Sequence, residues 1–216
     1  MRVEIASDVV CPWCFIGKRR FEAAVAQLAT EGVTLDLEVG YRAFMLDPSA
    51  PTTESRPVRE SYARRFGGDE KADKILANVT EIGTREGLEF NFGVAIRANT
   101  LRAHRLLKIV QRETPHLQSQ VNESVMNAYF RDAKNINEIA TLLSCAAQAG
   151  FGTRSLADEL ADDSADSPSA RAVAGDLEWA SRHDITAVPT FVVNDDFSIP
   201  GAQDTSTFIR LLRRFT

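Results

Sequence analysis

The hydrophobic pattern at the start of the chain predicts a strand, a helix and a second strand. Apolar and polar residues alternate over Arg2–Ala6, which indicates a short strand. Apolar residues then recur at helical spacing up to about Thr30. Pro12 suits the first helical turn, because the N–H that proline lacks would be unpaired there. A second alternating run predicts a strand over Val33–Met45.

Helical periodicity dominates the middle of the chain. It predicts helices over Val58–Phe66, Asp69–Glu86, Asn99–Glu113, Leu117–Phe130, Ile136–Ala149 and Arg154–Leu160. Asn135, with Glu138 three residues later, has the pattern of a capping box. A serine followed by a proline, at Ser167 and Pro168, predicts the start of a further helix that reaches about His183.

The end of the chain returns to a mixed pattern. Thr190–Val193 is an apolar run of strand-forming residues, and after a polar turn Phe197–Ile199 completes a predicted hairpin. Asp204 or Thr205 is predicted to cap a last helix. The predicted order is strand, helix, strand, a long helical insertion, a connecting helix, a hairpin and a final helix. This order indicates an α/β protein.

The composition is that of a soluble globular protein. Hydrophobic residues make up 44% and charged residues 25% of the 216 residues, which excludes a disordered, collagen-like or disulfide-rich chain. The net charge of −5 argues against a nucleic-acid partner, because such binding needs a cationic surface. No apolar run reaches about 18 residues, so we expect no membrane span.

The N-terminal sequence and the cysteine count favour a cytoplasmic protein. Glu4 and Asp8 interrupt the apolar run that a secretory signal would need. Three cysteines (Cys11, Cys14 and Cys145) are too few, and odd in number, for a secreted disulfide framework. A close cysteine pair in the cytoplasm is more often catalytic or metal-binding than structural.

The segment Cys11-Pro12-Trp13-Cys14 is the main chemical signal. Two residues between the cysteines, at a helix start, place both sulfurs within reach of one small disulfide. The unpaired N–H groups and the positive end of the helix dipole favour the thiolate of Cys11. We therefore expect Cys11 to be the exposed nucleophile and Cys14 to resolve the mixed disulfide. Pro12 and Trp13 are expected to tune the redox equilibrium.

A proline stands directly before the apolar run Thr190–Val193. It is Pro189, within the segment Thr186-Ala187-Val188-Pro189-Thr190. A proline at a strand entrance is allowed but needs a structural reason. Taken alone, an ordinary trans turn is the simpler interpretation.

Together these motifs resemble the DsbA-like thioredoxin superfamily, and within it the FrnE-type cytoplasmic thiol oxidoreductases. The resemblance covers nearly the whole chain. It lies in Ser7-Asp8 with Cys11–Gly17, Asn99-Thr100 with Ala103–Leu106, Ala128–Phe130, Val188–Val192 and Pro200–Gln203. It implies a thioredoxin-like fold with a central mixed sheet, interrupted by a large α-helical insertion domain. Residues 1–47 and 168–216 would form the thioredoxin-like domain and residues 48–167 the insertion.

The resemblance also implies roles for residues near the cysteine pair. It implies a cis Val188–Pro189 peptide bond facing the pair, so that the Val188 backbone offers a short edge to an extended substrate. A related branch, the kappa-class glutathione transferases and hydroxychromene-carboxylate isomerases, carries serine where this chain has Cys11, which favours redox chemistry here. Val188, Gln203 and Asp204 match positions where that branch holds glutathione. Glutathione or another thiol therefore stays open as a co-substrate.

Other residues are weaker candidates. His104 could line the substrate groove, with Asn99 at the start of its helix, or assist proton transfer to Cys14. The simpler interpretations are a hydrogen-bonded structural histidine and a helix cap. Cys145 is expected to be a small buried hydrophobic residue. The remaining cysteine and the three histidines are isolated in the sequence, so we expect no metal site.

The main hypothesis is a protein dithiol–disulfide oxidoreductase that acts on thiol or disulfide proteins or on small molecules. It would need no bound cofactor beyond the redox-active Cys11–Cys14 disulfide. One alternative is a glutathione-dependent isomerase or transferase, and another is a non-catalytic holdase or biosynthetic accessory module. The direction of electron flow, the natural substrate, the regenerating partner and the choice between monomer and homodimer stay open.

Overall fold

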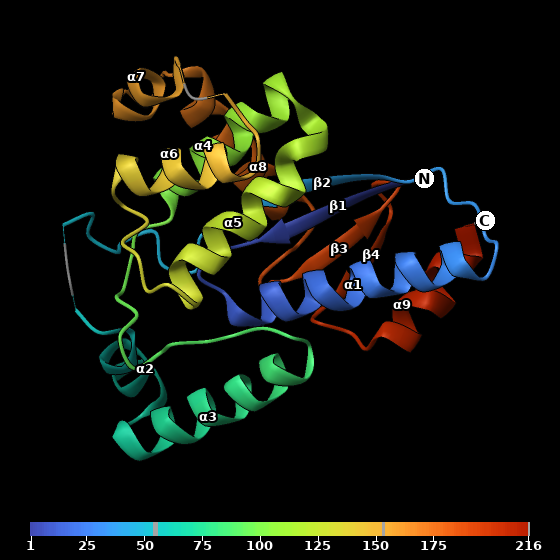
Figure 1. Cartoon of the computed structure of the whole chain (residues 1–216), viewed down its shortest axis with the longest axis horizontal. Coiled ribbons are helices and arrows are strands. Elements are labelled where there is room, and N and C mark those ends of the chain that lie inside the picture. Colours follow the sequence, from blue (N-terminus) through green and yellow to red (C-terminus); the bar gives the residue numbers. More distant parts are fainter. Residues whose placement is uncertain (54–55, 153, 216) are drawn as a thin grey trace.

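A four-stranded mixed sheet forms the centre of the protein (Figure 1). The computed structural model describes residues 1–53, 56–152 and 154–215. The strands are β1 (Arg2–Ser7), β2 (Glu38–Ala43), β3 (Thr190–Val193) and β4 (Phe197–Pro200), in the spatial order β2-β1-β3-β4. β1 and β2 are parallel, whereas β3 pairs antiparallel with both β1 and β4. The fold is thioredoxin-like and α/β, as the sequence predicts.

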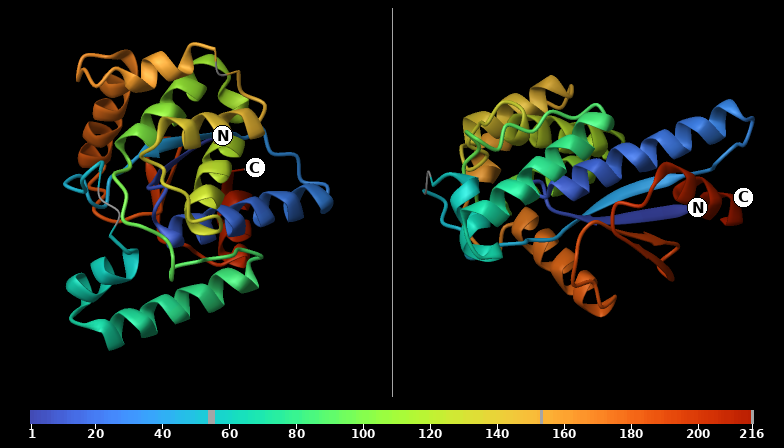
Figure 2. Two further views of the ribbon diagram at one scale, coloured as in Figure 1. Left: turned by 60° about the vertical axis from the view of Figure 1, so that its left-hand side comes forward. Right: turned by 90° about the horizontal axis from the view of Figure 1, so that it is seen from below.

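Helices cover both faces of this sheet (Figures 1 and 2). On one face lie α1 (Pro12–Thr30) and α9 (Thr205–Leu212), and on the other lies α8 (Pro168–Arg182). The rings of Phe21, Phe191 and Phe208 pack with centroids 4.7 to 5.5 Å apart on the first face. Since side chains alternate along a strand, Val192 points the other way and packs with Trp179 of α8.

In the described part of the chain, six α-helices follow β2 before α8 leads back to the sheet. They are α2 (Val58–Phe66), α3 (Asp69–Arg85), α4 (Leu101–Glu113), α5 (Gln118–Phe130), α6 (Ile139–Gln148) and α7 (Leu156–Ala161). Short 3-10 turns lie at Pro115–Leu117 and Arg213–Phe215. Figure 1 shows α2 and α3 on one side of the start of α1, and α4 to α7 on the other. The domain boundaries at residues 47/48 and 167/168 stay predictions.

The core of the helical part is continuous with the first turns of α1. Phe130 of α5 stacks 6.1 Å from Phe15 of α1 and packs 4.9 Å from Phe90. All three rings belong to one buried cluster that also contains Cys11 and Cys14. The helices that follow β2 thus pack directly around the cysteine pair and fix the surroundings of both sulfurs.

The predicted second strand is too long. The alternation over Val33–Met45 predicts thirteen strand residues, whereas β2 spans Glu38–Ala43. The register explains the difference, because Arg2, the first residue of β1, pairs with Glu38. Residues 33–37 therefore have no β1 residue to pair with. Their apolar side chains pack at the edge of the core without joining the sheet.

The predicted start of α6 is also wrong. The capping-box pattern places the helix start at Asn135, but α6 begins at Ile139 and Glu138 is its N-cap. The Asn135 side chain instead accepts a 3.0 Å hydrogen bond from the backbone N–H of Asn137, two residues on. Such a local turn competes with the helix for the same side chain.

A buried charge cluster ties α8 and α4 to β2. Asp176 of α8 is 1% exposed and accepts hydrogen bonds from Arg42 at 2.9 Å and from the backbone N–H of Ala43 at 2.9 Å. Its carboxylate also lies 2.8 Å from the ammonium group of Lys108. The Glu4 carboxylate accepts two further hydrogen bonds from the Arg42 guanidinium, at 2.9 and 3.2 Å. Each buried charge in this cluster therefore has a partner of opposite sign, as burial requires.

Candidate active site

The cysteine pair lies at the turn from β1 into α1. Cys11 is the N-cap of α1 in an extended backbone conformation, and Pro12 occupies the first helical position. The backbone N–H of Cys14 donates to the Cys11 carbonyl at 3.0 Å, which closes the first turn of the helix. Both cysteines are free of a disulfide in this structure. The sulfur of Cys11 thus lies beside the N–H groups of a helix start, where negative charge is stabilised.

The segment before β3 faces Cys11, although 177 positions separate the two in sequence. The Cys11 Sγ lies 3.7 Å from the carbonyl oxygen of Val188, and the Val188–Pro189 peptide bond is cis. A Cβ atom on Gly17 would lie 3.0 Å from the Pro189 side chain. Glycine at this position therefore lets α1 approach Pro189 closely.

Cys11 is less exposed than the sequence predicts. The expectation of an exposed nucleophile is wrong for this structure, in which Cys11 is only 4% exposed. Val188 on one side and the helical part on the other cover it. The neighbouring Trp13 is 37% exposed and forms the outer edge of this region. A partner must therefore reach the sulfur from within a cavity.

That cavity, here called the Cys11 cavity, has a volume of about 570 Å³. Its walls come from the start of α1, from α2, α3 and α5, from the segments after β2 and before α4, and from Val188. Its lining combines aromatic and cationic side chains: Trp13, Tyr62, Phe66 and Tyr129, with Arg56, Arg64, Arg65 and Arg97. Asp47 is the acidic residue of the lining and pairs with Arg97 at 2.5 Å. The cavity is thus apolar within and predominantly positive in a chain whose net charge is negative.

Burial dominates the ionisation of the groups around Cys11. It raises the pKa of the Cys14 thiol well above its ordinary value, and the hydrogen bond and negative charge of Cys11 raise it further. Burial, followed by the negative charge of Cys11, raises the pKa of Tyr62 to about 12. Cys14 is therefore a protonated thiol at neutral pH, and it must lose its proton before it can attack a disulfide.

Asn99 and His104 do not belong to the lining of the Cys11 cavity. The buried side chain of Asn99 donates a hydrogen bond to the Ala50 carbonyl at 2.6 Å. It also accepts a hydrogen bond from the backbone N–H of Leu101. It supports the start of α4, where Thr100 is the N-cap. His104 is 2% exposed and its Nε2 lies 3.2 Å from the Asp8 carboxylate. The structure thus buries both side chains outside the lining of the Cys11 cavity.

Gln203 and Asp204 lie in the loop between β4 and α9. This loop is beside Pro189, because the N–H of Gly201 donates to the Pro189 carbonyl at 2.7 Å. Gln203 donates to the Pro200 carbonyl at 2.6 Å, and Asp204 lies 3.1 Å from the Arg20 guanidinium. Neither side chain is part of the Cys11 cavity lining. Gln203 is half-buried and Asp204 is exposed.

Cys145 lies apart from the redox pair. It is 2% exposed, and its thiol donates to the Ser124 carbonyl at 3.6 Å on α5. Burial raises its pKa, so it is a poor nucleophile. The prediction of a small buried hydrophobic residue is confirmed.

Sequence reasoning missed much of the site. Tyr62, Arg64 and Arg65 project from α2, a helix in which no motif points to chemistry. Tyr129 lies in a segment on which the family resemblance rests, but the sequence of that segment does not predict that Tyr129 lines a cavity. Only the packing of α2 and α5 around the start of α1 brings these residues together.

Two further searches of the described residues gave negative results. Over residues 1–53, 56–152 and 154–215, no group of three or more metal-ligating side chains comes together. Within the same residues, no helix has the length and apolar character needed to cross a membrane.

The chain belongs to the DSBA-like thioredoxin domain family, whose model matches residues 2–213. The resemblance seen in the sequence is thereby confirmed. An uncharacterized protein of Bacillus subtilis, YwbO, is 28% identical over 209 residues, covering 96% of this chain and 94% of YwbO.

Solved structures show the same fold. The probable DsbA oxidoreductase SCO1869 from Streptomyces coelicolor superimposes with a TM-score of 0.85 at 29% identity, covering 99% of this chain and 89% of that one. The cytosolic disulfide reductase DsbM from Pseudomonas aeruginosa, solved with GSH, gives a TM-score of 0.65 at 16% identity, with coverage of 100% and 96%. Family and neighbours support a thiol–disulfide oxidoreductase or a related activity.

Proposed function

We propose that this protein is a cytoplasmic protein dithiol–disulfide oxidoreductase that uses Cys11 as nucleophile and Cys14 as resolving thiol. The observation that carries the proposal is the position of the Cys11 sulfur at a helix start, 3.7 Å from the Val188 carbonyl. The helix start favours a thiolate. The Val188 backbone, fixed by Pro189, offers a short extended edge on which a partner segment can pair.

The exchange has two steps in this geometry. The Cys11 thiolate attacks one sulfur of the partner's disulfide, a Cys11–partner disulfide forms, and the other partner sulfur leaves as a thiolate. Cys14 then loses its proton and attacks Cys11, so that the Cys11–Cys14 disulfide forms and the second partner thiolate leaves. Two electrons pass from the cysteine pair to the partner. Pro12 and Trp13 set the local polarity beside the sulfurs.

The Cys11 cavity supports a partner that carries negative charge near its disulfide. Arginine side chains outnumber Asp47 in its lining, and Arg64 and Arg65 lie on the exposed side of α2. Opposite charges across an interface raise the rate of encounter and fix the register. The aromatic side chains of the cavity suit an apolar residue next to the acidic one. We therefore propose an acidic segment beside the reacting disulfide as the preferred substrate.

A pair of cystine peptides that differ only in Glu or Gln beside the disulfide tests this preference. The double variant Arg64→Gln/Arg65→Gln is expected to lose about fivefold in kcat/KM for the acidic peptide, since each exposed charge pair contributes roughly 0.2–1 kcal/mol. The kcat/KM of this double variant for the neutral peptide should equal that of the wild type. Arg85→Gln, on the exposed surface of α3 outside the lining, is the matched control. Equal losses for both peptides would contradict the charge preference.

The cytoplasmic assignment rests on the small, odd number of cysteines, which does not fit a secreted disulfide framework. A cytosolic neighbour in the same fold, DsbM, is consistent with it.

Reduction of a model disulfide protein tests the proposed activity. The reduced wild type, regenerated by a dithiol, is expected to cleave the disulfide catalytically. Cys11→Ser should abolish the activity, because the attacking sulfur is lost. The Cys14→Ser variant should form the mixed disulfide with the partner and should not resolve it. A Cys11→Ser variant as active as the wild type would disprove the proposal.

A second candidate is a glutathione-dependent isomerase or transferase. The volume of the Cys11 cavity favours it, since about 570 Å³ is within the roughly 300–1,000 Å³ that small ligands occupy. Glutathione is an anionic thiol and would suit the arginines of the lining. Turnover of a small aromatic substrate that needs glutathione and survives Cys14→Ser would support this candidate over the first.

A further inference from the structure

Arg20, in the middle of α1, holds two segments that are far apart in the sequence. Its side chain is 16% exposed. The Nε atom donates a 2.6 Å hydrogen bond to the Glu86 carboxylate at the end of α3. The Nη1 atom donates a 2.9 Å hydrogen bond to the Ala202 carbonyl and lies 3.1 Å from the Asp204 carboxylate, both in the loop between β4 and α9. One guanidinium thus links the end of α3 to this loop, and both lie beside α1 (Figure 1).

Asp204 makes this contact in place of a local one. It is the N-cap of α9, but its side chain makes no hydrogen bond that caps the helix. An aspartate at an N-cap normally accepts a hydrogen bond from the N–H of the second or third helical residue, and that bond stabilises the helix. Here the carboxylate lies against Arg20 instead. The contact with Arg20 therefore outweighs the interaction that the position itself favours.

Glu86 also departs from the preference of its own helix. It is the C-cap of α3, and the C-terminal end of a helix dipole is negative, so a carboxylate there is unfavourable unless a cation lies beside it. Arg20 provides that cation at 2.6 Å. Two acidic residues thus break a local rule, and both contact the same guanidinium. Such departures are expected at functional sites, where a long-range contact matters more than local stability.

The loop that Arg20 holds is attached to the Pro189 turn. The backbone N–H of Gly201 donates a 2.7 Å hydrogen bond to the Pro189 carbonyl. Gly17, about one helical turn before Arg20, lies against both segments, because a Cβ atom on it would be 3.0 Å from the Pro189 side chain and 3.4 Å from Ala202. The loop and the Pro189 turn therefore pack on α1 as one unit, and Arg20 is the charged anchor of that unit.

We propose that Arg20 is a positioning residue for the exchange reaction. By holding the Ala202 carbonyl, it fixes where the Val188 backbone lies relative to the reactive sulfur. Val188 and Ala202 both pack against the buried cluster that contains Cys11, so a shift of the loop is transmitted to the partner-binding edge. This inference rests on the proposed function, in which a partner segment pairs with the Val188 backbone. Arg20 touches neither sulfur nor partner and acts only through the loop.

A guanidinium suits this role because it donates from several nitrogens in fixed directions. Nε and Nη1 serve different partners, the Glu86 carboxylate and the Ala202 carbonyl. An ammonium group is a single point of charge on a flexible stem, so Arg20→Lys keeps the charge of the cluster but not both directed hydrogen bonds. We therefore expect Arg20→Lys to behave between the wild type and Arg20→Gln.

A comparison of two disulfide substrates tests the positioning role. A cystine peptide can pair with the Val188 backbone, whereas 2-hydroxyethyl disulfide has no peptide backbone and reports the reactivity of Cys11 alone. Arg20→Gln is expected to raise KM for the cystine peptide about fivefold, as the loss of one net hydrogen bond to the partner would. Its kcat for the peptide should stay unchanged, because the lost pairing is uniform binding. Its kcat/KM for 2-hydroxyethyl disulfide should equal that of the wild type.

Arg19→Gln is the matched control. Arg19 is the neighbouring arginine of α1, but it pairs with Glu123 of α5 and makes no contact with the loop between β4 and α9 among the interactions of the described residues. The substitution removes the same charge and one ion pair from the same helix. It should leave KM for the cystine peptide at the wild-type value, whereas Arg20→Lys should show an intermediate rise.

The outcomes separate this inference from the proposed function. A wild type that exchanges with neither disulfide would refute the proposed function itself. A wild type that exchanges with both, together with an Arg20→Gln variant of unchanged KM, would overturn the positioning role alone. An equal loss for both substrates would also overturn it, because general damage to the fold does not distinguish a peptide from a small disulfide. A rise in KM for the peptide only, smaller in Arg20→Lys and absent in Arg19→Gln, supports the role.

Discussion

Replacing Asp176 by leucine should cost a large part of the stability of the fold. Asp176 is 1% exposed and holds Arg42 at 2.9 Å, Lys108 at 2.8 Å and the backbone N–H of Ala43 at 2.9 Å. Lys108, only 8% exposed, would lose the carboxylate that it contacts. Removing one partner of a buried ion pair costs about 3–5 kcal/mol, because the other charge is left uncompensated.

Urea unfolding followed by circular dichroism measures this effect. Natural domains have unfolding free energies of about 5–15 kcal/mol, so the expected loss is easily resolved. Asp163→Asn is the matched control, since Asp163 pairs with Arg102 at 3.1 Å but its side chain is 80% exposed. An exposed pair of this kind contributes about 0–1 kcal/mol.

A double variant separates the buried charge from other effects of the substitution. Asp176→Leu/Lys108→Met removes both members of the pair, while Arg42 keeps its contacts to Glu4. The double variant should be more stable than Asp176→Leu alone, because no lysine is left uncompensated. A single substitution that costs no more than the Asp163 control, or a double variant without recovery, would refute this reasoning.

Two further predictions concern packing and pH. A Cβ atom on Gly83 would overlap the Phe90 ring, so Gly83→Ala should cost about 1–3 kcal/mol of unfolding free energy and lower Tm. Burial acts to raise the pKa of Glu123, but the hydrogen bonds and charges of Lys18 and Arg19 outweigh it and hold the pKa low. Glu123 therefore stabilises the fold above its unfolded pKa, and this contribution is lost as the pH falls through its folded pKa. The stability difference between the wild type and Glu123→Gln should be largest near neutral pH and shrink in acid; a difference independent of pH would contradict the assignment.

Local patterns were sufficient for most of the secondary structure. Pro12 and Ser167 mark the starts of α1 and α8 through chemistry that acts within one helical turn, and the Ser167 side chain accepts from the N–H of Ala170 as a cap should. One error arose where a distant strand sets the length of an element, and the other where two local interactions compete for one side chain. The length of β2 follows from where β1 begins, and Asn135 forms a turn with its neighbours although its pattern predicts a cap.

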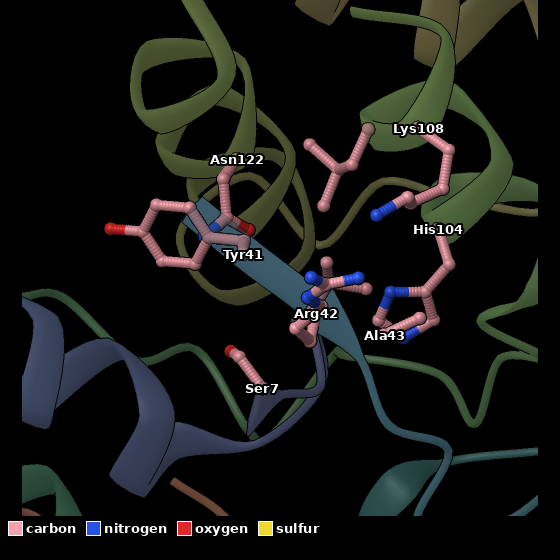
Figure 3. Close-up of a pocket in the computed structure, with 9 residues that line it drawn as sticks. Ser7, Tyr41, Arg42, Ala43, His104, Lys108 and Asn122 are labelled. Atoms are coloured by element: carbon pink, nitrogen blue, oxygen red, sulfur yellow. The ribbon is translucent and has the colours of Figure 1, made fainter. Parts of the chain in front are cut away.

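The chemistry of the site was more predictable than its shape. The four-residue segment from Cys11 to Cys14 is sufficient to predict redox chemistry. Pro189 is recognisable because it stands directly before a predicted strand. The burial of Cys11 and the positive lining of its cavity depend on how α3 packs against α1 and holds α2 beside the cysteine turn, which no local pattern encodes. Asn122, which lines the small cavity drawn in Figure 3, looks like any polar helical residue until the structure shows that its amide is buried and has no hydrogen-bond partner among the residues described.

The most direct test of the central claim is the mass of a trapped intermediate. Cys14→Ser in a Cys145→Ser background leaves Cys11 as the reactive cysteine, and it is incubated with a cystine peptide under non-reducing conditions. The account predicts a stable adduct of one half-peptide on Cys11, since no resolving thiol remains. No adduct on Cys11, or the same adduct in a Cys11→Ser protein, would contradict it.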